Sequence, residues 1–135
     1  ATWARSRKGK YEDAEPLYRR AIEITEAILG KDHPRNSLQL SNLAGLLMEQ
    51  GKYEDAEPLL RRAMEVTEAT LGKDHPDYSV DLSNLAWLLQ THGKYEDAEP
   101  LYRRAMEITE ATLGKDHPDY SLRLSNLAGL LEKQV

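Results

Sequence analysis

The nine residues GKYEDAEPL occupy residues 9–17, and the same nine letters return at residues 51–59 and 93–101. The two steps are equal, because 51 − 9 = 42 and 93 − 51 = 42. A fixed period of this size is typical of repeat proteins, in which each unit buries its apolar face only against its neighbours. The spacing predicts a single array over residues 1–135, with repeats at residues 9–50, 51–92 and 93–134.

The sequence of each repeat predicts two helices. In the middle copy, Leu82, Leu85, Ala86 and Leu89 follow the i, i+3, i+4, i+7 spacing of one helix face. A glycine follows this stripe, a second apolar stripe begins after it, and another glycine follows that one. Glycine is the residue that most readily ends a helix in a left-handed conformation. We therefore expect an all-α fold in which a helix of about 15 residues pairs with one of about 19.

The segment GKDHP stands between the helix pairs, and its proline suits the first turn of the next helix. The histidine before each proline invites a metal or catalytic interpretation, but each copy lies in a separate turn, far beyond the ligand distances of about 2 Å that a metal needs. We expect these histidines to be turn residues. They are His33, His75 and His117.

Composition excludes several classes of function. The 135 residues carry 18 basic and 23 acidic side chains, a net charge of −5, which disfavours nucleic acid as a partner. No apolar run approaches the roughly 20 residues that span a membrane. There are no cysteines, so neither disulfides nor thiolate metal sites are possible, and a cytoplasmic location is expected. No phosphate-binding loop or nucleophile motif is present, so we expect no enzyme activity and no cofactor.

The apolar pattern resembles the tetratricopeptide repeat. That family's first helix carries a large residue, then leucine, a small residue and another large one, as at Leu40, Leu43, Ala44 and Leu47. Its second helix carries the pattern found here at Gly51, Tyr53, Ala56, Leu60 and Ala63. The usual period is shorter than 42 residues, and the longer form is similar to the repeats of kinesin light chain. The resemblance implies a right-handed superhelical solenoid of antiparallel helix pairs, whose first helices line a concave face.

The first-helix residues that packing does not use are the candidates for peptide binding on that face. One asparagine recurs in every copy, and its amide offers a donor and an acceptor to a peptide backbone. The kinesin light chain pattern implies this role, while the alternative is that the asparagines bridge neighbouring helices. The candidates on this face are Asn42, Asn84 and Asn126, with the apolar Leu38, Val80 and Leu122.

One further slot alternates between tryptophan and glycine, at Trp3, Gly45, Trp87 and Gly129. A glycine inside a helix costs about 1 kcal/mol relative to alanine, so close packing or room for a ligand should compensate. Trp87 is either an aromatic anchor for a partner or a filler of the space beside the glycines. Three neighbouring positions, Gln39, Asp81 and Arg123, vary in charge, so a strongly acidic ligand is not expected.

The two ends of the array look unfinished. The last helix repeats the apolar stripe with no second helix after it, and residues 1–8 align with the end of a first helix whose packing leucines are replaced. We therefore hypothesise that copies associate through the terminal helices, by a head-to-tail or a two-fold contact. The residues expected to contribute are Leu124, Leu127 and Leu131. The sequence favours a scaffold that binds a protein or peptide in its groove, with a self-assembling solenoid as the alternative.

Overall fold

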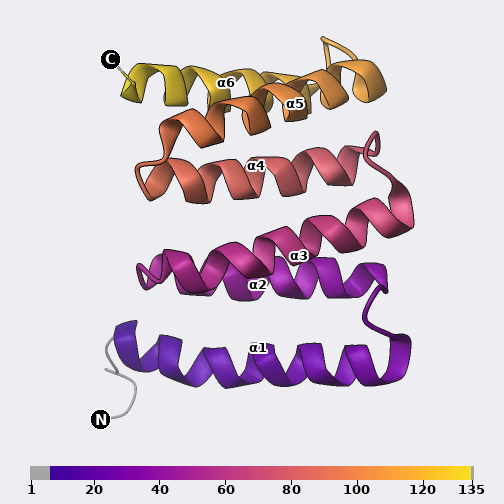
Figure 1. Cartoon of the computed structure of the whole chain (residues 1–135), viewed down its shortest axis with the longest axis vertical. Coiled ribbons are helices and arrows are strands. Elements are labelled where there is room, and N and C mark those ends of the chain that lie inside the picture. Colours follow the sequence, from indigo (N-terminus) through magenta and orange to yellow (C-terminus); the bar gives the residue numbers. More distant parts are fainter. Residues whose placement is uncertain (1–6, 135) are drawn as a thin grey trace. The chain divides into compact units, whose positions relative to one another are not determined.

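A computed structural model describes residues 7–134 of the chain, and the side chains from Gly9 onward. This part of the chain forms six helices and no strands (Figure 1). They are α1 (Arg7–Leu29), α2 (Pro34–Glu49), α3 (Tyr53–Leu71), α4 (Pro76–Thr91), α5 (Tyr95–Leu113) and α6 (Pro118–Lys133). The alternation of 16-residue helices (α2, α4, α6) with 19-residue helices (α3, α5) confirms the two-helix repeat.

The first helix of each pair begins with the expected proline, and the preceding histidine caps it. In α4, Nδ1 of His75 accepts a hydrogen bond of 3.0 Å from the backbone N–H of Asp77. His33 and His117 do the same for Arg35 and Asp119, at 3.1 and 3.0 Å. The imidazole thus satisfies one of the N–H groups that a helix leaves unpaired at its start. The histidines are turn residues, as expected. The structure shows in addition that each one caps the helix that follows it.

Removal of one cap should be measurable. His75→Ala is expected to lower the free energy of unfolding by about 1 kcal/mol, because the N–H of Asp77 loses its acceptor. His75→Asp, which restores an acceptor at the same place, should recover most of the loss. Urea unfolding of both variants at neutral pH checks this, and equal stability of His75→Ala and the unmodified protein would show that the cap contributes nothing.

The turns between α2 and α3 and between α4 and α5 depend on glycine. Gly51 and Gly93 have φ of +77° and +81°, which other residues adopt only at a cost. After Gly93, the N–H of Lys94 returns to the carbonyl of Leu89 at 2.7 Å, so the helix end is satisfied before the chain reverses into α5.

The first copy of the motif differs from the other two. Gly9 lies inside α1, which begins at Arg7, whereas Gly51 and Gly93 lie in turns. The expected helix remnant at residues 1–8 is therefore wrong for residues 7 and 8, which belong to α1, and its remaining residues lie outside the described part. The sequence carries Arg5 at the position of the buried Leu47 and Leu89, so this copy lacks the leucine that packs beside the turn elsewhere.

The chain divides into two compact units, Ala1–Val66 and Thr67–Val135, and the boundary falls inside α3. In the first unit α1 packs on α2. In the second unit α5 packs on both α4 and α6, and the three helices lie side by side (Figure 1). The proposed division into three repeats of one array stays a prediction.

The predicted first-helix stripe forms the core. Its members in α2 and α4 are at most 3% exposed. They are Leu40, Leu43, Ala44 and Leu47, and Leu82, Leu85, Ala86 and Leu89. On the second helices, Ala98, Tyr102, Ala105 and Ile108 are likewise buried.

Candidate peptide-binding groove

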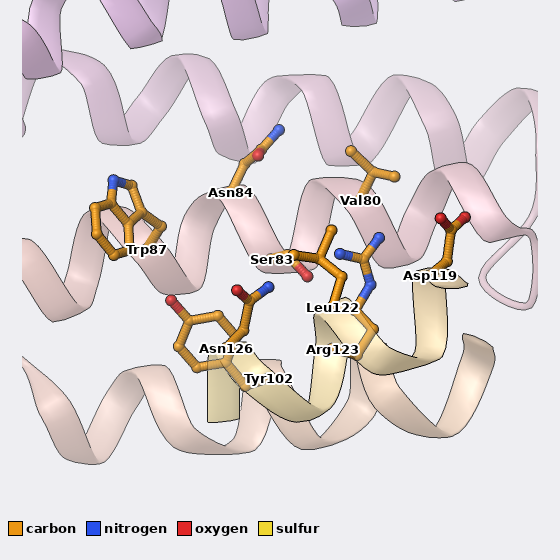
Figure 2. Close-up of a pocket in the computed structure, with 9 residues that line it drawn as sticks. All are labelled: Val80, Ser83, Asn84, Trp87, Tyr102, Asp119, Leu122, Arg123 and Asn126. Carbon is orange, nitrogen blue, oxygen red and sulfur yellow. The ribbon is translucent and has the colours of Figure 1, made fainter. Parts of the chain in front are cut away.

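An open groove of about 440 Å³ lies in the second unit, between α4 and α6 (Figure 2). Ligand-binding pockets commonly fall between about 300 and 1,000 Å³. Apolar and amide side chains predominate on its surface, and one residue comes from α5. The lining residues are Val80, Ser83, Asn84, Trp87, Tyr102, Asp119, Leu122, Arg123 and Asn126.

Five of the residues predicted for peptide binding meet in this groove. Val80, Asn84 and Trp87 come from α4, and Leu122 and Asn126 come from α6. Trp87 is 56% exposed, so it does not fill a space between helices. Val80 and Leu122 are also exposed, which leaves an apolar surface on both sides of the groove.

The side chains of Asn84 and Asn126 face the groove and are bonded to no other described residue. Among the described residues, neither Asn84 nor Asn126 has a hydrogen-bond partner, and neither amide is buried. The alternative that they bridge neighbouring helices therefore has no contact in the structure to support it. Each amide keeps a donor and an acceptor available to a molecule in the groove.

The other predicted residues lie elsewhere. Leu38, Asn42 and Gly45 are on α2, in the first unit. Gly129 is on α6, outside the groove lining. A Cβ added at Gly45 or Gly129 would meet no atom within 4 Å, so close packing does not explain either glycine.

Arg123 lies at the floor of the groove. A chain of hydrogen bonds connects its side chain to two other helices. Its Nε donates to Oγ of Ser79 at 3.1 Å, and Ser79 lies 3.0 Å from Oγ1 of Thr109. Because Thr109 donates its own proton to the carbonyl of Ala105 at 2.9 Å, Ser79 must be the donor to Thr109. The relay links α6 to α4 and α5, and it fixes the guanidinium in place.

The guanidinium keeps donors available to a ligand. The side chain of Arg123 is only 6% exposed, and burial lowers its pKa while the charge of Asp119 raises it. Nε makes the one hydrogen bond found for Arg123 among the described residues. An arginine carries five N–H donors, so the others remain for water or a ligand. Asp119 also lines the groove, which balances the charge there.

Sequence reasoning missed Tyr102, and it did not foresee that Asp81 and Arg123 are buried. Tyr102 donates its hydroxyl to Oε1 of Gln90 at 2.9 Å, and burial raises the pKa of Tyr102 to about 12. The sequence places Gln39, Asp81 and Arg123 at one variable position beside the groove, but only Arg123 lines it. Asp81 and Arg123 are buried, and Gln39 is half-buried, its Oε1 without a hydrogen-bond partner among the described residues. The 42-residue spacing shows that all three share one repeat position, but the residue type changes from copy to copy and gives no sign of burial.

No group of side chains suited to a metal ion occurs among the described residues. Within that same part of the chain, none of the helices is long and apolar enough to cross a membrane.

These features define an α-helical repeat protein with an open groove on its first helices. A family model described as tetratricopeptide repeat matches residues 36–111 and 93–134, and a second model with that description matches residues 4–35. The chain belongs to the tetratricopeptide repeat family. Repeats of this family generally mediate protein–protein interactions.

Solved structures show the same fold. The chain is similar to BtubC (BKLC) from P. vanneervenii, with a TM-score of 0.82, 23% identity, and coverage of 92% of this chain and 50% of that one. It is also similar to a Podosopora anserina putative kinesin light chain with nearly identical TPR-like repeats, which has been solved both as such and with a single substitution. Both of these structures give a TM-score of 0.79, 24% identity, and coverage of 91% of this chain and 58% of theirs.

The chain therefore spans between half and three fifths of these proteins. Their likeness confirms the all-α superhelical repeat fold of kinesin light chain-like type. A comparison with curated proteins finds no match.

Proposed function

We propose that this chain is a protein-interaction scaffold that holds a peptide segment of a partner in the groove between α4 and α6. The observation that carries the proposal is the pair of amides at Asn84 and Asn126, which line one groove and bond to nothing among the described residues. Buried polar groups are nearly always hydrogen-bonded within a protein, whereas these two amides remain accessible in the groove. The role requires no catalytic step.

The arrangement of the groove suits an extended peptide or one face of a short helix. Helices that pack together stand roughly 8–10 Å apart. An extended peptide advances about 3.3 Å per residue, so amides on successive first helices can meet about every third peptide unit. Trp87, Val80 and Leu122 supply apolar contacts for side chains, and Arg123 supplies donors for a carbonyl or carboxylate oxygen.

A selection experiment tests the proposal. The full chain is immobilised and panned against a random-peptide phage library, and the selected peptides are synthesised for calorimetry. Trp87→Ala is expected to weaken their binding about 30-fold, as for an aromatic hot spot worth about 2 kcal/mol. Asn84→Ala should weaken it about fivefold to tenfold through the lost hydrogen bonds.

The matched control is Leu113→Ala, an exposed apolar residue at the end of α5 that does not line the groove. It should leave peptide binding unchanged. Trp87 and Asn84 are not buried, so these substitutions should alter the free energy of unfolding by no more than about 0.5 kcal/mol. Selected peptides that bind Trp87→Ala and Asn84→Ala as tightly as the unmodified chain, or a selection that enriches no peptide, would exclude this groove as the binding site.

A further inference from the structure

One face of α6 is exposed although its sequence matches a buried face. Leu124 is 46% exposed and Leu131 is 39% exposed. The residues 42 positions earlier, Leu82 and Leu89 on α4, are each 3% exposed. Ala128, between the two exposed leucines, is exposed as well. Leu127 is 7% exposed and already packed, so it does not belong to this surface, which we call the α6 face (Leu124, Ala128 and Leu131).

A second such face lies on α1. Tyr18 is 36% exposed and Ile24 is 42% exposed. Their counterparts 84 positions later on α5, Tyr102 and Ile108, are 2% and 3% exposed. In contrast Thr25, which follows Ile24, is buried at 7%. The exposed residues Tyr18 and Ile24 form what we call the α1 face.

The two faces correspond to two surfaces that pack together elsewhere in the chain. The α6 face corresponds to the residues of α4, and the α1 face corresponds to the residues of α5. In the second unit α4 and α5 pack against each other. The α6 face of one molecule can therefore pack on the α1 face of another in the way that α4 packs on α5. We infer that the chain associates head to tail, α6 of one copy packing on α1 of the next.

A polar pair supports this particular partner. Tyr102 on α5 donates its hydroxyl to Gln90 on α4 at 2.9 Å. The corresponding residues are Tyr18 on α1 and Glu132 on α6, which are both exposed. A head-to-tail contact would bring this hydroxyl to a carboxylate, and hydrogen bonds to charged acceptors are stronger than neutral ones.

In the remaining repeat both positions are apolar, Leu60 on α3 and Met48 on α2. The two positions thus change together in the chain, from leucine with methionine to tyrosine with glutamine. Tyr18 and Glu132, which occupy the same two repeat positions and are both exposed, are also a polar pair. A docking partner with an apolar residue in place of Tyr18 would leave the Glu132 carboxylate facing apolar surface, which is costly.

A charge pair at the edge of the contact follows the same correspondence. Asp74, in the turn before α4, accepts a hydrogen bond of 3.0 Å from Arg104 on α5. The matching residues are Asp116, in the turn before α6, and Arg20 on α1, and both are exposed. Opposite charges again meet in a head-to-tail contact. Such exposed pairs add little affinity, but they favour the correct register.

The contact joins two different surfaces, so a bound pair of copies still has one free α6 face and one free α1 face. Head-to-tail contacts of this kind continue into rings or filaments, whereas a two-fold contact stops at a dimer. The inference does not rest on peptide binding, and it uses no residue of the groove.

Sedimentation velocity of the complete chain over a range of concentrations tests the inference. We expect the mean mass to rise with concentration beyond that of a dimer. Leu124→Asp and Tyr18→Asp should each be monomeric when alone, because each removes one face. An equimolar mixture of the two should form a 1:1 complex and nothing larger, because one α1 face and one α6 face remain intact. Both side chains are exposed in the single molecule, so circular dichroism should show unchanged helix content.

A pairwise exchange adds a specificity test. Tyr18→Leu alone should weaken association about tenfold, because Glu132 loses its donor. Adding Glu132→Met copies the Leu60 and Met48 pair and should restore association to within about threefold of the unmodified chain. Trp87→Ala should leave association unchanged, which separates this contact from the groove.

Several results would overturn the inference. A monomer at the highest attainable concentration would do so, as would a mixture of Leu124→Asp and Tyr18→Asp that stays monomeric. Dimers of Tyr18→Asp alone would show a two-fold contact between α6 faces instead. Failure of Glu132→Met to improve Tyr18→Leu would exclude the assigned pairing.

Discussion

Replacing Asp81 with asparagine is expected to stabilise the protein at neutral pH and to remove a slope in its pH profile. The side chain lies on α4 at 7% exposure, and one of its oxygens, Oδ2, is buried without a hydrogen-bond partner among the described residues. Burial raises the pKa of the Asp81 carboxyl from 3.8 to about 6, against the opposing effect of a hydrogen bond with Thr67. The charge of Asp77 raises the pKa further. The folded protein therefore binds the proton more tightly than the unfolded chain.

The direction of the pH effect follows from this difference. Between pH 3.8 and about 6 the folded state holds more protons at Asp81 than the unfolded state does. The contribution of this residue to stability therefore falls as the pH rises through that range. The penalty is complete above about pH 6 and amounts to about 3 kcal/mol for the ionised carboxylate. In the asparagine variant, the side chain carries no charge at any of these values.

Urea unfolding at several values between pH 4.5 and 7.5 measures the effect. Asp81→Asn should be more stable than the unmodified protein by about 1–3 kcal/mol at pH 7, the lower value applying if its buried amide N–H group finds no acceptor. The advantage should shrink toward pH 4.5. Asp77→Asn is the matched control, because this carboxylate is exposed on the same helix and should leave most of the slope in place. An advantage that is constant with pH would contradict the assignment.

The register of the repeat made most of the fold predictable. Aligning the copies placed prolines at the starts of α2, α4 and α6, and it identified the buried stripe that includes Leu43 and Leu85. The groove was predictable in part, because Asn84, Trp87 and Leu122 are what remains when packing residues are removed. These inferences depend only on the 42-residue period and the helical spacing of apolar residues, both of which can be read from the sequence.

The rest depends on neighbours that lie elsewhere in the chain. Arg123 looks like a surface charge in the sequence, but it is buried because Ser79, 44 residues away, accepts its Nε–H. Gly9 is followed by the same eight residues as Gly51, yet it is helical, because a helix ends where packing favours a reversal. Leu124 and Leu82 occupy the same repeat position and differ more than tenfold in exposure. Identical residues at equivalent repeat positions therefore do not contribute equally to stability.

That last pair gives a prediction with a large effect. Leu82→Ala is expected to lower the free energy of unfolding by about 3–5 kcal/mol, because the side chain is 3% exposed and its removal leaves a cavity beside α5. Leu124→Ala, at the equivalent position of α6, is expected to cost less than about 1 kcal/mol, because nearly half of that side chain already contacts water. The two substitutions delete the same atoms from the same repeat position.

The measurement must separate folding from association, because the two leucines are expected to contribute to different equilibria. Urea unfolding at a low protein concentration, where the head-to-tail contact is dissociated, should show the full difference between the variants. As the concentration rises, the unmodified chain should gain stability from association, since binding to the folded state alone stabilises it. Leu124→Ala should gain less, and Leu82→Ala should still gain. Equal losses for both variants at low concentration would mean that α6 is covered in the single molecule, and the α6 face would then be unavailable to a second copy.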